Sequence, residues 1–167
     1  MSMISVTLPD GSIHEYSTGI TAGEIVIDIE GRKHDCVAAM VDGEQKDFSA
    51  ILDADCTVTG ISAFDDDGMY ILRHSAAHLL AQAITSIYPE AKPTIGPPVD
   101  RGFYYDFADL NDFGEADLKA VQKKMHELAR RNLTLERKEC SNAELEELFA
   151  DNPYKLEIMK DKLEEGA

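Results

Sequence analysis

Two histidines, His74 and His78, stand four residues apart in a segment whose apolar pattern predicts a helix over residues 68–88. Side chains at this spacing are neighbours on a helix, with roughly 5–6 Å between their β-carbons, so two imidazoles can act on one small target. Both rings fall opposite the main apolar sector, which contains Met69, Leu72, Ala76, Leu79, Leu80, Ala83 and Ile87. With the small residue Ala81 beside them, they are interpreted as the floor of a cleft. The alternative is a pair of histidines hydrogen-bonded to polar neighbours.

An imidazole pair can hold a metal ion or move a proton. The H-x-x-x-H spacing lacks the glutamate of H-E-x-x-H, so the metalloprotease motif is absent. A tetrahedral zinc site would need further ligands, and only Cys140 and His126 are available in this part of the chain, without a diagnostic spacing. We therefore expect no metal site, and we expect His126 at the surface. Acid–base catalysis is the remaining role for the two histidines, because the reference pKa of histidine, about 6.5, suits proton transfer near neutrality.

The composition is that of a soluble globular protein, with 167 residues and 44% hydrophobic content, enough for one domain or two small ones. No apolar run is long enough to span a bilayer and no signal pattern begins the chain, so we expect a cytoplasmic protein without a membrane partner. Three cysteines without C-x-x-C spacing indicate buried thiols. The net charge of -16 is opposite in sign to that of a protein that binds nucleic acid by itself. Binding of an RNA partner would therefore need further contacts from a larger protein.

Residues 1–63 predict a small mixed sheet packed on one helix. A hairpin over residues 4–16 is followed by a capping box, Thr21 to Glu24, which opens a short helix ending near Gly31. Three further strand signals follow. The order ββαβββ indicates a ubiquitin-like β-grasp fold, and the acidic joint that begins at Phe64 marks a domain boundary.

The rest of the chain, residues 64–167, predicts helices and few strands. After the histidine helix come a strand over 99–107, a helix over 115–131, a strand over 133–139 and a helix opened by a capping box at Ser141. An amphipathic segment closes the sequence. Two strands are too few for a stable sheet, so this second domain is expected to be incomplete.

Several segments resemble, in the same order, the editing domain of the threonyl-tRNA synthetase family. They are Arg73-His74-Ser75-Ala76-Ala77-His78-Leu79-Leu80, Ile95-Gly96-Pro97-Pro98, Gly102-Phe103-Tyr104-Tyr105-Asp106, Met125-His126-Glu127-Leu128 and Tyr154-Lys155. Residues 1–63 resemble the TGS domain that precedes it. The resemblance implies an α+β protein, with a β-grasp TGS domain over 1–63 and the N-terminal part of the editing domain over 64–167.

The activity that the resemblance implies is hydrolysis of seryl-tRNA mischarged on threonine tRNA. Serine lacks one methyl group of threonine, a difference worth only about 1–3 kcal/mol in binding, so a second, hydrolytic site is needed. The family's H-x-x-x-H pair falls on His74 and His78, which are implied to position or deprotonate the attacking water. Tyr105, in the G-F-Y-Y-D strand, is implied to shape the amino-acid pocket, and Lys155 to contact the ribose or phosphate of the terminal adenosine.

The family's downstream C-x-x-x-H half-site and its ATP-dependent catalytic and anticodon-binding domains have no counterpart before Ala167. We therefore expect an N-terminal fragment without ligase activity. ATP, magnesium, zinc and the contacts of a homodimer are expected only in the absent domains. The alternative function is a non-catalytic module that binds tRNA or protein. A free-standing deacylase related to the alanyl editing family would need the C-x-x-x-H residues, and a GTPase is excluded because no P-loop is present.

Overall fold

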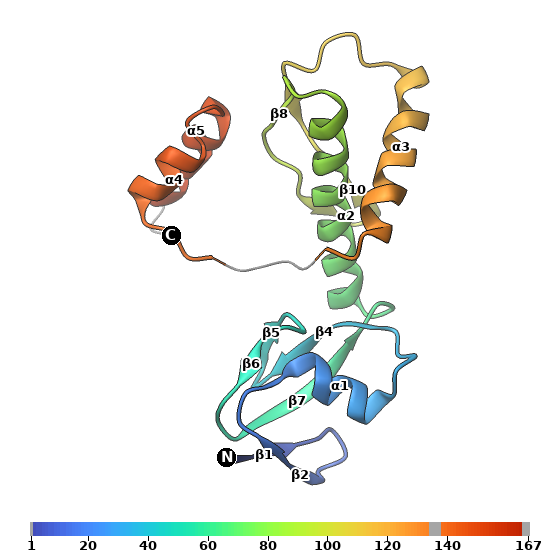
Figure 1. Ribbon diagram of the computed structural model, residues 1–167, viewed down its shortest axis with the longest axis vertical. Helices are drawn as coiled ribbons and strands as arrows, with labels where there is room; N and C mark the ends of the chain where they lie inside the picture. Colours follow the sequence, from blue (N-terminus) through green and yellow to red (C-terminus); the bar gives the residue numbers. More distant parts are fainter. Residues whose placement is uncertain (1, 134–137, 165–167) are drawn as a thin grey trace. The chain divides into compact units, whose positions relative to one another are not determined.

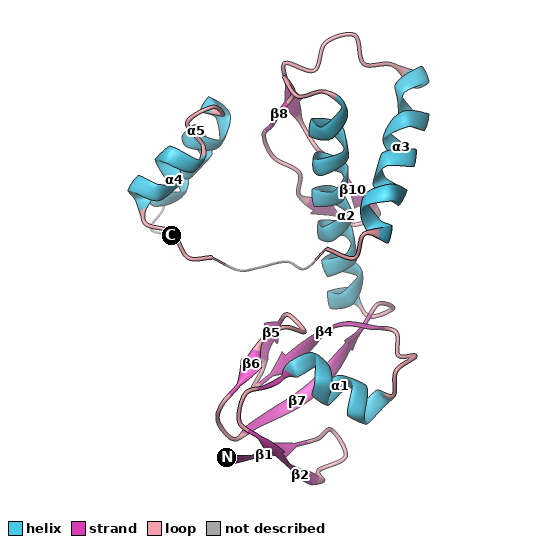
Figure 2. Ribbon diagram, in the orientation of Figure 1, coloured by secondary structure: helices cyan, strands magenta, loops and turns pink. Residues whose placement is uncertain are grey.

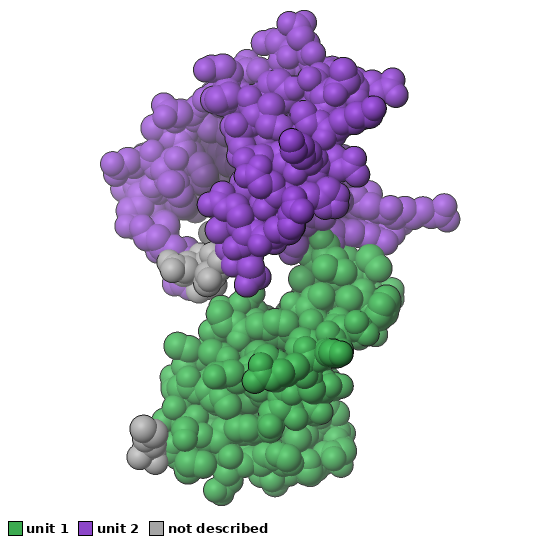
Figure 3. Space-filling model, turned by 45° about the vertical axis from the view of Figure 1, so that its right-hand side comes forward, with its two compact units in different colours: residues 1–72 green, residues 73–167 purple. Residues whose placement is uncertain are grey.

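The computed structural model describes residues 2–133 and 138–164 and divides into two compact units, residues 1–72 and 73–167 (Figure 3). The division falls inside the long helix α2 (Asp66–Ile87), which begins just after the domain boundary expected at residues 63 and 64. None of the helices in the described ranges is both long and apolar enough to cross a membrane. Each unit is described by itself.

The first unit is a five-stranded sheet with one helix, α1 (Ala22–Glu30), packed on two of its strands (Figures 1 and 2). The sheet runs in the order β2 (Ile13–Ser17), β1 (Met3–Thr7), β7 (Cys56–Ser62), β4 (Cys36–Val41) and β5 (Glu44–Lys46). Strands β1 and β7 are parallel, and all other neighbours are antiparallel. A separate short pair joins β3 (Ile20–Thr21) to β6 (Ile51–Leu52). This arrangement confirms the predicted β-grasp fold.

Local sequence signals fix the ends of these elements. Thr21 caps α1, because its Oγ1 accepts a hydrogen bond from the Glu24 amide at 3.2 Å while the Glu24 carboxylate accepts from the Thr21 amide at 2.9 Å. The two-residue turn between β4 and β5 places Asp42 at φ 49° and Gly43 at φ 82°, the left-handed backbone that such hairpins require. The predicted capping box is confirmed.

A continuous apolar core holds the helix to the sheet. Its fully buried members come from both layers and include Val6, Ile25, Val26 and Val58. The three cysteines are half-buried free thiols, and burial raises the pKa of Cys36 and of Cys56. Desolvation disfavours the reactive thiolate of Cys36 and Cys56, although none of the three cysteines is as fully buried as predicted.

The second unit is built on α2, from residue 73 onward, and α3 (Glu115–Arg130), which share a small core of Ala83, Ile84, Ala91, Val121 and Leu128. Its strands are two-residue pieces, with β8 (Lys92–Pro93) paired to β11 (Phe107–Ala108) and β9 (Pro98–Val99) paired to β10 (Gly102–Phe103). Two helices without buried residues, α4 (Asn142–Leu148) and α5 (Pro153–Glu164), complete it.

The expectation of one continuous strand over residues 99–107 is wrong. A turn at Asp100 and Arg101 reverses the chain, so that Gly102 pairs with Val99 and the strand is split into separate pieces. The partner strand begins at Pro98, and because proline has no amide hydrogen to donate, only a short ladder can form there. The strand expected over 133–139 falls mainly on residues 134–137, which lie outside the described residues.

The buried face of α2 also differs from the expected apolar sector. Ala77, Ala81 and Ile84 are buried, whereas Leu72 is 40% exposed. The core around Ile84 draws on both α3 and the 91–110 segment, so α2 is covered over a wide arc rather than along one stripe. Small alanine side chains suit that arc, since they let neighbouring backbone approach closely.

Candidate functional site

The two histidines lie on successive turns of α2 and contact each other through their rings. The Nε2 atoms of His74 and His78 are 3.1 Å apart, and the ring centroids are 4.8 Å apart at an interplanar angle of 36°. A hydrogen bond of this kind needs one nitrogen with a proton and one with a lone pair. The contact therefore requires that at least one of the two rings is neutral, with its Nε2 lone pair turned to the other ring.

The surroundings of His78 favour its neutral form. His78 is exposed overall, but partial burial of its ring lowers the pKa of the imidazole, and the charges of His74 and Lys155 lower the pKa further. A depressed histidine pKa keeps the lone pair available for accepting a proton at neutral pH. The arrangement can therefore supply a general base.

His78 opens onto a pocket of about 510 Å³ at the C-terminal end of α3. From α2, the pocket is lined by Ser75, His78, Leu79 and Gln82. From the end of α3 and the residues after it, the pocket is lined by Leu128, Ala129, Asn132 and Leu133. The polar residues Ser75 and Gln82 were not predicted from the sequence as part of the site. Their spacing of three and four residues from His78 was a signal that could have identified them. Asn132 is brought there only by the packing of α3.

Lys155, on α5, lies within electrostatic reach of His78, since its charge contributes to the lowered pKa of that ring. Its Nζ atom lies 5.6 Å from the centroid of the Phe149 ring. The Lys155 amide donates to Oδ1 of Asn152, and Nδ2 of Asn152 donates to the carbonyl oxygen of Pro93 at 2.9 Å. Asn152 thus fastens the start of α5 to β8, a role that the sequence pattern did not reveal.

Tyr105 lines a different pocket from the one beside His78. That second pocket, about 400 Å³, is mainly apolar and includes Leu80, Ile84 and Phe107. The Tyr105 ring stacks on Phe107 with centroids 5.0 Å apart, and burial raises the pKa of its hydroxyl. Gly96 lies against the same ring, because a β-carbon on Gly96 would fall inside it.

The other two residues considered as metal ligands lie away from the histidine pair's pocket. His126 is exposed on α3, as predicted, and Cys140 is half-buried before α4. Within residues 2–133 and 138–164, no three His, Cys, Asp or Glu side chains come together in a way that could hold a metal ion. The described site is thus a histidine pair, a pocket and a nearby lysine.

The class of protein is defined first by the β-grasp unit. Residues 4–60 match the family model of the TGS domain, so the chain contains a TGS domain, which has the ubiquitin-like β-grasp fold.

The chain as a whole is homologous to the N-terminal region of threonine–tRNA ligase. It is 40% identical over 161 residues to the threonine–tRNA ligase of Paraburkholderia phytofirmans, and 42% identical over 163 residues to that of Acidithiobacillus ferrooxidans. It is 42% identical over 158 residues to that of Rubrobacter xylanophilus. These matches cover 94–95% of the chain, which spans 25% of the length of each relative.

Proposed function

We propose that this chain takes part in hydrolysing the ester that joins serine to threonine tRNA, as an editing module of a threonine–tRNA ligase. The observation that carries the proposal is the 3.1 Å approach of the His74 and His78 Nε2 atoms beside a pocket of about 510 Å³. Homology to threonine–tRNA ligase supports tRNA as the partner, and the need to reject serine supports the ester as the substrate.

In the proposed reaction, water adds to the ester carbonyl carbon and the bond from that carbon to the ribose oxygen breaks. His78, kept neutral by its lowered pKa, accepts the proton that the water loses, and the proton passes to the departing ribose oxygen. His74 holds the His78 ring in position through the Nε2 contact. Lys155 supplies a positive charge for the ribose or phosphate of the terminal adenosine. The products are free serine and uncharged tRNA.

The test is release of serine from serylated threonine tRNA by this chain and by His74→Ala and His78→Ala. Loss of a positioned acid–base group lowers the rate by about 10²–10⁴-fold, and we expect His78→Ala to fall in that range. His14→Ala is the control, because His14 is exposed on β2 in the other unit. Undiminished hydrolysis in both site variants would sink the assignment.

The same assay on a longer enzyme that carries the downstream C-x-x-x-H sequence distinguishes hydrolysis by this chain from the alternative function, a non-catalytic module. Hydrolysis by the longer enzyme alone would mean that the 167-residue chain is a recognition module and that the histidine pair is one half of a split site. Hydrolysis by both would mean that His74, His78 and their neighbours suffice.

A further inference from the structure

Helix α3 carries a basic stripe on its outer face, formed by Lys119, Lys123, His126 and Arg130. These residues follow one another at steps of four, three and four, so they share one side of the helix. The buried residues Val121 and Leu128 occupy the opposite side. With Gln122, the stripe lines a shallow groove of about 350 Å³.

The charges of this basic stripe are only partly compensated within the described part of the chain. Neither Lys119, Lys123 nor Arg130 forms an ion pair with a described residue, although the charge of Lys123 contributes to the lowered pKa of Glu127. Two acidic side chains of α3 are already engaged, since Glu127 pairs with Lys124 at 3.0 Å and Asp117 accepts from the Gly114 amide. Glu115, one turn before Lys119, is the other acidic residue of α3 near the start of the stripe.

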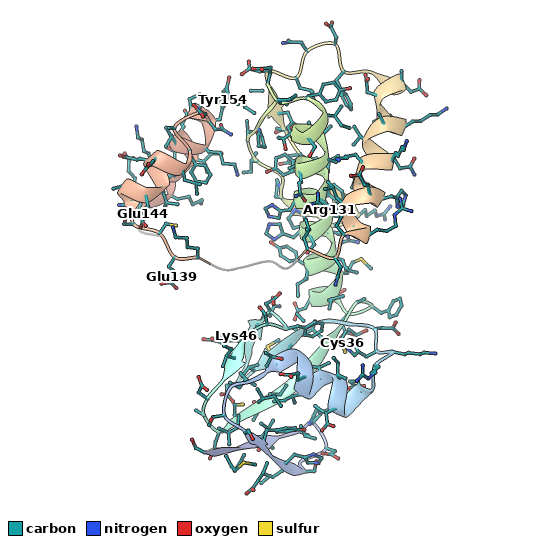
Figure 4. All side chains as sticks on the ribbon, viewed as in Figure 1. Cys36, Lys46, Arg131, Glu139, Glu144 and Tyr154 are labelled. Atoms are coloured by element: carbon teal, nitrogen blue, oxygen red, sulfur yellow. The ribbon has the colours of Figure 1, made fainter. Side chains whose placement is uncertain are left out.

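The basic residues are segregated along the chain. Residues 1–72 contain Arg32, Lys33 and Lys46 as their only lysines and arginines, and all others lie in residues 73–167. The net charge of -16 is therefore concentrated in the TGS unit, and the α3 stripe is a local exception on an acidic molecule. Figure 4 labels Lys46 in the first unit and Arg131, the residue that directly follows α3.

The composition of the groove favours phosphate over protein as its occupant. Its lining contains lysine, arginine, histidine and glutamine, with no apolar side chain among the described residues. Protein interfaces rely on buried aromatic and aliphatic anchors, whereas nucleic-acid backbones are held by Lys and Arg contacts to phosphate. From Lys119 to Arg130 the stripe extends about 16 Å, enough for several consecutive phosphates.

We propose that the basic stripe of α3 binds the phosphate backbone of an RNA strand and directs the end of that strand to the pocket beside His78. Arg130 directly follows Ala129, which lines that pocket together with His78. The second half of this inference rests on the proposed function, since it assigns the strand end to the hydrolytic site. The first half, phosphate binding by the stripe, stands on the charge and geometry of α3 alone.

The test compares two triple variants of the 167-residue chain that change the net charge equally. Lys119→Gln/Lys123→Gln/Arg130→Gln removes the stripe, and Arg32→Gln/Lys33→Gln/Lys46→Gln removes exposed cations of the TGS unit. The probe is a fluorescently labelled, uncharged threonine tRNA, titrated at several salt concentrations. We expect the stripe variant to bind at least tenfold more weakly and to lower the slope of log K against log salt by about 2 to 3, with little change in the control variant.

Three outcomes overturn the proposal: no binding by the unaltered chain, equal weakening in both variants, or displacement of the RNA by polyglutamate of equal charge. Glutamine is a good helix former, so the stripe variant should keep the circular dichroism of the unaltered chain. Serine release separates this proposal from the hydrolytic one. If the unaltered chain binds RNA through the stripe but releases no serine, phosphate binding by the stripe holds, whereas hydrolysis by this chain alone and delivery of the strand end to its pocket both fail. If both hold, the stripe variant raises KM while kcat is retained.

Discussion

At the level of single residues, the distance of 3.1 Å between the Nε2 atoms decides which protonation states His74 and His78 can share. Two cationic rings at that distance would repel each other and leave no acceptor. A single proton between them satisfies both nitrogens. The partial desolvation of the His78 ring and the charge of Lys155 act in the same direction, because both disfavour a second proton.

The pKa of His78 should therefore respond to its charged neighbours. We expect His74→Ala and Lys155→Met each to raise the pKa of His78 toward the ordinary value. The rise should be larger in His74→Ala, because His74 contributes more than Lys155 to the lowered pKa. The measurement is an NMR titration of the imidazole Cε1 proton. Lys160→Met, an exposed charge further along α5, is the matched control.

This prediction has a consequence for stability. A histidine with a lowered pKa binds fewer protons in the folded chain than in the unfolded chain, so the folded state loses stability as the pH falls below about 6.5, the reference value. The loss should be smaller in His74→Ala. An unchanged titration curve for His78 in both variants would contradict the electrostatic coupling on which the pair depends.

At the level of elements, short sequence motifs predicted the features that depend only on residues close together in the sequence. The capping boxes at Thr21 and Ser141 could be predicted because each needs only residues within one turn of each other. The position of the histidine pair on one helix face followed from the same short-range spacing. These features involve no partner distant in sequence.

The features that were not predicted depend on contacts between distant segments. The pocket beside His78 exists because α3 ends against α2. The position of Asn132 in the sequence does not indicate that packing. The attachment of α5 to β8 depends on a hydrogen bond from Asn152 to Pro93. The splitting of the aromatic strand reflects tertiary pairing of Gly102 with Val99, which overrides the high strand propensity of that segment.

The loop that contains Gly96 gives the element-scale prediction. Gly96→Ala should destabilise the second unit by about 1–3 kcal/mol, the usual cost of overpacking, because the added β-carbon meets the Tyr105 ring. That ring is held against Phe107 and has little room to move. Gly102→Ala is the matched control, since no heavy atom lies within 4 Å of its added β-carbon. Equal urea midpoints for the two variants would show that the loop does not pack on Tyr105.

At the scale of the whole molecule, the two units differ in the size of their buried cores and in their number of basic residues. The TGS unit has a ten-residue buried core and few basic residues, whereas the second unit has a smaller core and most of the lysines and arginines. A small core supports little stability by itself, since hydrophobic stabilisation scales with buried apolar area. The second unit, which carries the pair His74 and His78, is therefore expected to be the less stable of the two.

Separate cores imply that each unit responds to damage in its own core. Ile25 is 0% exposed in the first unit and Ile84 is 2% exposed in the second, so each substitution to alanine should cost about 2–5 kcal/mol in the unit that contains it. Hydrogen exchange, followed by mass spectrometry, reports the two units separately. A loss of 2 kcal/mol accelerates exchange by about 30-fold. We expect that acceleration in α1 and the sheet for Ile25→Ala, and in α2 and α3 for Ile84→Ala. Equal acceleration of both units by either variant would mean that the chain unfolds as one cooperative body, and the histidine pair would then depend on the TGS unit for its stability.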